Sequence, residues 1–174
     1  MSTDAAAFAT LRQIADLVSA YGEVEITDRQ VSLALPPTAE QHEVARRLGS
    51  RLSAQLPRLH PELAVRPSPV VEDPGPGRRY RPDLVVGEAP GPMLLVVEVV
   101  SAAGPARDCD AKVRDYAAMG FLNYLLVDPR EGTGIVYSQP GYSSREKFAF
   151  GDTITVGPWT LDTSGLPSYG PDPA

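Results

Sequence analysis

The sequence predicts a mixed α/β fold in which helices flank a β-sheet. Two apolar runs, at residues 93–100 and 123–128, are typical of interior strands, and the segment 108–119 between them has the start and stop residues of a helix. A strand, a helix and a strand in this order form a crossover, so a parallel or mixed sheet is expected. The 174 residues, 43% of them apolar, are enough to bury one substantial core. We therefore predict a single domain over residues 1–169 and a disordered tail over residues 170–174.

The first third of the chain predicts a helix, a hairpin and a second helix. Residues 4–20 have apolar side chains at helical spacing, with a glycine close behind as a stop. Residues 23–27 and 31–35 alternate polar and apolar side chains on either side of a short polar turn, which is a hairpin pattern. Thr38 opens a capping box, and apolar residues then recur every four positions, which predicts a helix to about residue 56.

Two strands are predicted in the middle of the chain, at residues 81–86 and 93–100. If the loop between them closes a simple hairpin, Asp83 lies opposite Val96, and Glu98 is its diagonal neighbour on the same face. A slip of one residue would turn Glu98 to the other face. The hairpin therefore predicts two carboxylates close enough to share one ion.

The helix predicted after these strands carries two candidate side chains. Asp108 is a good N-cap residue, and Gly120 is placed to end the helix. Lys112 and Tyr116 are four residues apart, so both lie on one side of this helix. The simpler alternatives are that Asp108 only caps the helix, that Lys112 is solvated, and that Tyr116 packs in the core.

Further extended segments are expected on both sides of this region. Residues 63–71 are expected to be extended and residues 72–78, rich in proline and glycine, to form a loop. Residues 135–138 are expected to pair with the strand that precedes them, and residues 147–150 and 153–156 to form a hairpin. The single tryptophan near the C-terminus is interpreted as an apolar lid or an interface residue.

Charge and composition exclude several classes of protein. The net charge of -6 argues against broad, nonspecific attraction to nucleic acid, although a local basic patch stays open. Two arginine clusters could form such a patch or could be ordinary solvated surface; they are Arg46, Arg47, Arg51 and Arg58, and Arg78, Arg79 and Arg81. One cysteine and two separated histidines predict neither an internal disulfide nor a zinc site. The absence of a signal-like start or an apolar span predicts a cytoplasmic protein without membrane contact.

Glu98 is the most informative residue because it lies inside the most apolar run of the chain. A buried carboxylate needs a cation, and the candidates are a metal ion and Lys112. Asp83, Glu98 and Lys112 form the minimal set for metal-dependent phosphodiester cleavage. The alternatives are that Asp83 is a turn residue and that Glu98 forms a buried salt bridge without metal. If no metal is bound, we expect Glu98 to contact Lys112 directly.

These residues, taken as a set, resemble a known family. The resemblance is to the Uma-two family, a bacterial group of restriction-endonuclease-like proteins in the PD-(D/E)XK nuclease superfamily, and it covers about residues 20–165. The matching signatures are Arg81-Pro-Asp83, Val97-Glu-Val-Val-Ser101, Asp108 with Lys112 and Tyr116, Gly120, Tyr124 and Leu126-Val-Asp-Pro129. The resemblance implies a restriction-endonuclease-like core: a mixed β-sheet flanked by helices, with an N-terminal helix and β-hairpin.

The resemblance also implies a mechanism. Asp83, Glu98 and the backbone carbonyl of Val99 would bind Mg²⁺, with Mn²⁺ as a substitute, and a metal-bound water would attack the phosphate. In the simplest pattern of the superfamily a lysine stands two residues after the acid, where this chain has Val100. The implied lysine is Lys112, supplied by the following helix. Accessory roles are assigned to Glu25 as a third acid, to Asp108 and to Tyr116; for Glu25, the polar face of an alternating strand is an equal alternative.

The expected partners follow from this mechanism. DNA is the expected substrate, with phosphate contacts from Arg47, Arg51, Arg79 and Arg81, and a homodimer is expected because a chain this small has little surface with which to grip a duplex alone. The alternative function is a non-catalytic dimeric interaction or regulatory module on the same fold. It is favoured by the acidic net charge, whereas retention of both acids and the lysine favours the enzyme.

Overall fold

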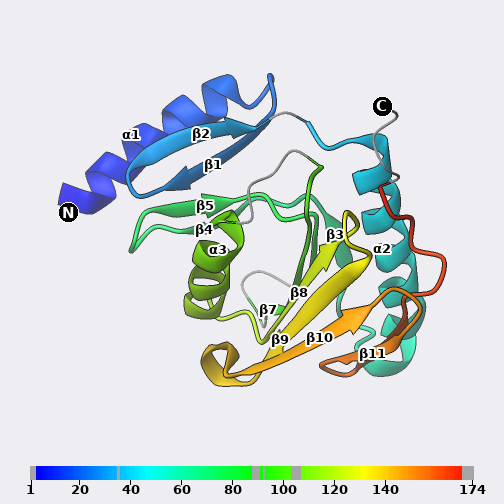
Figure 1. Ribbon diagram of the computed structural model, residues 1–174. Helices are drawn as coiled ribbons and strands as arrows, with labels where there is room; N and C mark the ends of the chain where they lie inside the picture. Colours follow the sequence, from blue (N-terminus) through cyan, green and yellow to red (C-terminus); the bar gives the residue numbers. More distant parts are fainter. Residues whose placement is uncertain (1–2, 35, 88–90, 92, 103–106, 170–174) are drawn as a thin grey trace, which may run out of the picture. The chain divides into compact units, whose positions relative to one another are not determined.

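A computed structural model describes residues 3–34, 36–87, 91, 93–102 and 107–169 (Figure 1). The chain forms two compact units: Met1–Pro37 with Ser68–Pro82, and Thr38–Pro67 with Asp83–Ala174. The prediction of a single domain stays a prediction, and the predicted tail lies outside the described residues. None of the helices in the described part of the chain is long and apolar enough to span a membrane.

The first unit consists of a helix and an antiparallel sheet of four strands in the order β2-β1-β5-β4. Phe8 and Ala15 of the helix form its core with Val24 and Ile26 of the sheet. The predicted helix and hairpin are confirmed, but the predicted loop at 72–78 is too long, because its two ends form a second hairpin. The elements are α1 (Thr3–Val18), β1 (Glu23–Thr27), β2 (Gln30–Ala34), β4 (Val71–Asp73) and β5 (Arg78–Tyr80).

The second unit is built on a mixed sheet of six strands in the order β10-β9-β8-β7-β6-β3. β7 and β8 are parallel, and α3 (Arg107–Ala118) connects them, so the predicted crossover is confirmed. The other pairs in this sheet are antiparallel. The strands are β3 (Val65–Pro67), β6 (Leu84–Gly87), β7 (Met93–Val99), β8 (Asn123–Asp128), β9 (Thr133–Ser138) and β10 (Ser144–Ala149).

Helices cover both faces of this sheet, and alternation along β7 decides which side chain meets which helix. Leu95, Val97 and Val99 share a core cluster with Val44 and Leu48 of α2 (Ala39–Leu59), which begins at the predicted cap Thr38. The Glu98 side chain points to the opposite face of the sheet, towards α3. Buried side chains on both faces explain why β7 is an almost continuous apolar run.

The C-terminal part departs from the prediction in its strand pairing. Segment 147–150 does not pair with 153–156: β10 pairs with β9, while β11 (Thr153–Val156) pairs with β12 (Trp159–Asp162). The physical reason is that Trp159 is fully buried, so a strand carrying it belongs to the core on the α2 side. The interpretation of this tryptophan as a lid or interface residue is therefore wrong.

Candidate active site

The two predicted acids come from neighbouring strands of the second unit. Asp83 immediately precedes β6, and Glu98 is the last residue but one of β7. Leu84 lies opposite Val97, so continuing the register brings Asp83 level with Glu98 instead of Val96. The predicted register is wrong by two residues, and the bulge at Val86/Gly87 accounts for one of them. A shift of two keeps both carboxylates on one face.

Asp83 is fixed to the end of β7 by a hydrogen bond. The backbone N–H of Val99 donates to Asp83 Oδ2 over 2.7 Å. The carboxylate thus takes the place of a backbone acceptor where the β6–β7 ladder stops. This bond holds Asp83 next to the residue that follows Glu98.

Glu98 binds the two side chains that α3 places on its sheet-facing side. Lys112 Nζ lies 3.1 Å from Glu98 Oε1, and the Tyr116 hydroxyl donates to the same oxygen over 2.5 Å. The Glu98 and Lys112 side chains are each 12% exposed, so their charges are largely shielded from water. The predicted direct contact between Glu98 and Lys112 is confirmed, and the alternative of a solvated lysine is wrong.

Tyr116 packs in the core, as the simpler alternative for it predicts, and it also contacts Glu98. Its ring is fully buried and makes edge contacts with Phe121 and Tyr124, at centroid distances of 5.5 and 5.4 Å. Its hydroxyl nevertheless reaches Glu98. A tyrosine can therefore fill the core beneath α3 and still orient the carboxylate, because its apolar ring and polar tip have different surroundings.

The oxygen atoms gathered here suit a hard divalent cation. Asp83 is bonded to the Val99 N–H and Glu98 directly precedes Val99, so two carboxylates and the Val99 carbonyl belong to the end of β7. Mg²⁺ binds through one or two carboxylates while keeping several waters. Within the described residues, no three His, Cys, Asp or Glu side chains are grouped closely enough to hold a metal. Oxygen donors of this kind fit Mg²⁺ or Mn²⁺ better than zinc, which prefers nitrogen and sulfur ligands.

Two further residues contact the backbone beside Glu98, and neither is among the predicted site residues. Gln41, near the start of α2, donates from Nε2 to the Val99 carbonyl over 3.0 Å. Tyr169, near the end of the described chain, donates from its hydroxyl to the Val100 carbonyl over 2.8 Å. Burial, together with the negative charges of Asp83 and Asp128, raises the pKa of the Tyr169 phenol to about 12.

A family comparison agrees with this geometry. The model of the Uma2 family, described as "Putative restriction endonuclease", matches residues 19–164. The chain belongs to the Uma2 family. No curated protein matches it in sequence.

Solved structures place this Uma2 family member in a nuclease-like fold. A crystal structure from Anabaena variabilis ATCC 29413, named a putative nuclease belonging to DUF820, is 15% identical, with a TM-score of 0.63 over 76% of this chain and 80% of that one. The predicted restriction-endonuclease-like core is thus confirmed as a fold. The cryo-EM structure of a DrdV–DNA complex is 14% identical over 82% of this chain and 12% of that one, at a TM-score of 0.41.

Arg47 and Arg51, two of the arginines predicted to bind phosphate, have protein partners. Arg47 donates to Glu43 over 2.6 Å and also to the Gly165 carbonyl, and Arg51 donates to the Ser164 carbonyl over 2.7 Å. These bonds join α2 to the segment after β12. The Glu43 carboxylate also binds Arg46, and these arginines lower its pKa to about 2.

The second arginine cluster lies in the first unit. The Arg79 side chain is 7% exposed and forms ion pairs with Asp16 at 2.7 Å and Glu72 at 3.7 Å, so this placement does not support a phosphate contact. Arg81 is partly buried. Neither of these residues belongs to the unit that carries the acids.

The remaining accessory residues contribute less. Glu25 lies in β1 of the first unit, on the partly exposed face opposite Val24 and Ile26, as an alternating strand requires. Asp108 lies within the first turn of α3, which begins at Arg107, so Asp108 is not the cap; its side chain is outside the described part of the structure.

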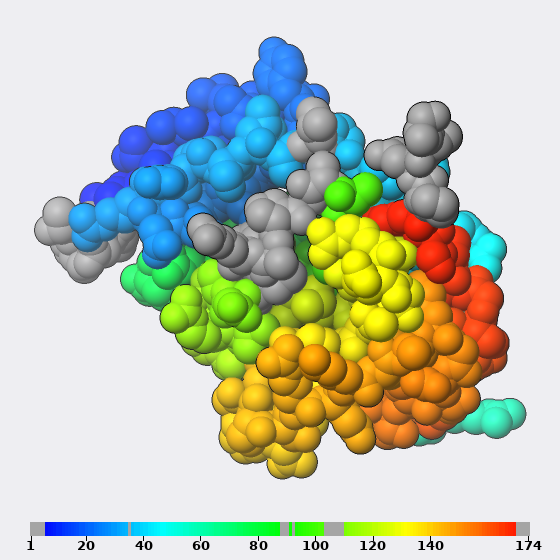
Figure 2. Space-filling model, viewed as in Figure 1, coloured from blue at the N-terminus to red at the C-terminus, as the bar shows by residue number. Residues whose placement is uncertain are grey.

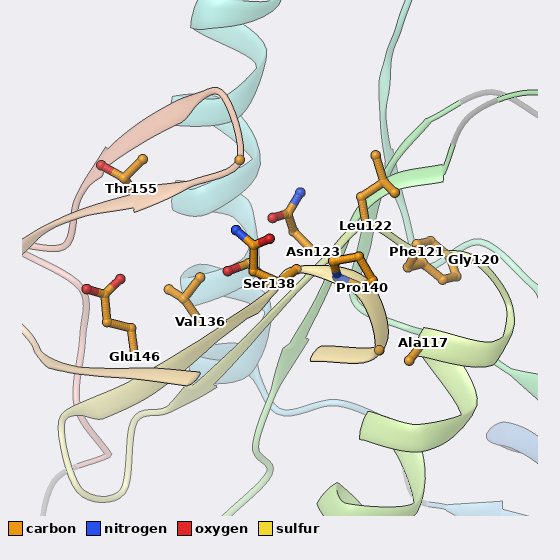
Figure 3. A pocket seen from close by; sticks show the side chains of 13 residues that line it. Ala117, Gly120, Phe121, Leu122, Asn123, Val136, Ser138, Pro140, Glu146 and Thr155 are labelled. Atoms are coloured by element: carbon orange, nitrogen blue, oxygen red, sulfur yellow. The ribbon is translucent and has the colours of Figure 1, made fainter. Parts of the chain in front are cut away.

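A cavity of about 680 Å³ opens at another part of the second unit (Figure 3). Its lining runs from Ala117 and Phe121 near the end of α3 to Ser138 and Glu146 of β9 and β10. Here α3 lies beside the 3-10 helix η1 (Pro140–Tyr142) (Figure 2). Neither the two acids nor Lys112 lines this cavity, so the candidate chemistry lies elsewhere.

Proposed function

We propose that this Uma2 family member is a Mg²⁺-dependent endonuclease that hydrolyses phosphodiester bonds of DNA. The observation that supports this most is the convergence of Glu98, Lys112 and the Asp83-bound end of β7 within one unit. Family membership supports the same reaction class.

Each residue has a role that its surroundings support. Asp83, Glu98 and the Val99 carbonyl would hold the cation, which supplies Lewis acidity and an acidified water molecule when bound. Lys112 places a positive charge beside Glu98, where it can stabilise negative charge that accumulates on a phosphate. Tyr116 keeps the Glu98 carboxylate oriented through its hydroxyl. The Lys112 ammonium, 3.1 Å from Glu98 Oε1, also offsets the charge of this carboxylate.

One observation favours the alternative, a non-catalytic module. Glu98 Oε1 already accepts hydrogen bonds from both Lys112 and Tyr116, so this carboxylate is stabilised without an ion. On that hypothesis the pair is purely structural. The two hypotheses differ in one measurable property, the affinity for a divalent cation.

The proposal includes a homodimer that acts in the cytoplasm. A dimer would let two copies cut opposite strands through a two-fold axis. Light scattering on the purified chain tests this part, because the monomer has a mass of 18.6 kDa.

The experiment compares cleavage and metal binding in one set of proteins. Wild type, Asp83→Ala, Glu98→Gln and the control Glu146→Gln, which changes an exposed carboxylate on β10, are incubated with plasmid DNA, single-stranded DNA or RNA and Mg²⁺ or Mn²⁺. We expect cleavage of DNA by wild type and the control only. In parallel, calorimetry should detect Mn²⁺ binding by these two proteins and not by an Asp83→Ala, Glu98→Ala double variant. A wild type that cuts no substrate and binds no Mn²⁺ would establish the non-catalytic module.

A further inference from the structure

Every backbone N–H and carbonyl of the two residues that follow Glu98 is hydrogen-bonded. Val99 donates to Asp83 Oδ2 over 2.7 Å and accepts from Gln41 Nε2 over 3.0 Å. Val100 donates to the Val127 carbonyl over 2.8 Å and accepts from the Tyr169 hydroxyl over 2.8 Å. Both N–H groups and both carbonyls of the Val99–Val100 segment therefore have partners, and three of these four partners are side chains.

The ladder itself cannot supply these partners. The Val99 N–H and carbonyl point to the β6 side of β7, as the bond to Asp83 shows, but paired residues on β6 end at Leu84. Pro82, which precedes Asp83, has no N–H with which to continue the ladder. A carbonyl at this position needs a donor from elsewhere, because a buried carbonyl without one is costly. Gln41 is that donor.

Both side-chain donors are themselves fixed. The Gln41 backbone N–H is capped by Thr38 Oγ1 at 3.2 Å, and the whole residue is only 7% exposed. The Tyr169 backbone N–H donates to the Pro129 carbonyl over 3.0 Å, just after β8. Each donor is anchored by its own backbone and reaches the segment with its side-chain tip. Such an arrangement fixes the direction of a carbonyl more narrowly than a strand end would alone.

We propose that Gln41 and Tyr169 are positioning residues of the metal site. Gln41 aims the Val99 carbonyl, which has a second lone pair for the cation, and Tyr169 holds the next peptide so that Glu98 and Val99 keep their relative orientation. This inference rests on the proposed function, because it assigns a purpose to the carbonyl as a ligand. Neither residue touches the substrate or the ion.

The test uses isosteric variants with matched controls. Gln41→Met removes the donor and keeps the length of the side chain; its control is Gln55→Met, because Gln55 on the same helix also donates to a backbone carbonyl, that of Thr160, over 2.8 Å. Tyr169→Phe removes a hydroxyl; its control is Tyr142→Phe, because the buried Tyr142 hydroxyl has no hydrogen-bond partner among the described residues. Calorimetry with Mn²⁺ alone measures the affinity of each protein.

We expect Gln41→Met to weaken Mn²⁺ binding about tenfold, the lower end of what second-sphere changes do to metal sites, and Tyr169→Phe to weaken it less. The variant that carries both substitutions should lose less Mn²⁺ binding free energy than the two single variants together, because both residues act on one segment. The controls should bind Mn²⁺ like wild type. Wild-type affinity in Gln41→Met, or an equal loss in Gln55→Met, overturns the positioning role. Absence of binding by wild type overturns the proposed function instead, so the two failures are distinguishable.

Discussion

The Glu98–Lys112 pair makes a sharp prediction about stability, which we develop through Lys112→Met. Helix propensity alone suggests that replacing Lys112 with alanine leaves the fold nearly intact. The structure changes this expectation, since both side chains are 12% exposed and in contact at 3.1 Å. Methionine keeps most of the apolar stem and removes the ammonium. The variant therefore isolates the charge.

The magnitude follows from what Glu98 keeps and loses. Removing one partner of a fully buried pair costs roughly 3–5 kcal/mol, because the other charge stays buried. Here Glu98 keeps the Tyr116 hydroxyl at 2.5 Å, and a hydrogen bond to a charged group contributes about 1.5–3 kcal/mol. Partial exposure also lowers the penalty. We expect Lys112→Met to lower the free energy of unfolding by about 2 kcal/mol.

A second variant separates the lost pair from lost packing. Glu98→Gln removes the negative charge and still offers an acceptor to Tyr116, so the double variant has no buried charge at this position. The decrease in the free energy of unfolding of the double variant should be smaller than the sum of the two single decreases by about 1–2 kcal/mol. An additive double variant would show that the two charges do not interact.

Trp159 provides the assay. It is the chain's single tryptophan, it is fully buried, and it belongs to the same unit as the pair. Urea unfolding followed by its fluorescence therefore reports on the relevant core, and far-ultraviolet circular dichroism of the same samples checks that the transitions coincide. A loss below about 0.5 kcal/mol in Lys112→Met, which is typical of surface positions, would refute the reasoning. In the nuclease assay the same variant should lose about a hundredfold in rate.

Three further outcomes are expected. Gly134→Ala should lower the free energy of unfolding in urea by roughly 1–3 kcal/mol. The added Cβ would lie 2.6 Å from the Leu126 carbonyl oxygen and would also meet the Phe148 ring. An unchanged urea midpoint would contradict this close contact. The raised pKa of Tyr169, about 12, means that its stabilising contribution is complete below about pH 10 and is lost as pH rises towards 12. Wild type should therefore lose stability relative to Tyr169→Phe between about pH 10 and about pH 12. Hydrogen bonds from Arg130 lower the pKa of Asp128, so the ionised carboxylate stabilises the fold above the ordinary carboxyl pKa and this stabilisation is lost below it. Asp128→Asn should therefore remove part of the acid sensitivity of the fold. Unfolding measured below about pH 4 tests this.

Much of the second unit could be predicted because its signals are local. The run at 93–99, the helix after it and the next run at 123–128 define a crossover whatever the rest of the chain does. The register of β6 against β7 could not be predicted from the number of loop residues alone, because a bulge at Val86/Gly87 also shifts it. The partner of β11 was missed for a similar reason. Two hairpins compete for this strand, and the burial of Trp159 decides between them only once the core exists.

The groups that aim the Val99 carbonyl could not be predicted, and the reason is physical. Gln41 and Val99 are 58 residues apart in the chain, and Tyr169 and Val100 are 69 apart. Both contacts end on backbone oxygens, which every residue has, so no side chain at either position records them. Glu98, by contrast, is a charge in an apolar setting and demands a cation that a sequence can name. A motif search therefore finds the acids and the lysine of such a site but not the donors that fix its carbonyl, and a relative that keeps those three residues without Gln41 would match the motif with a weaker metal site.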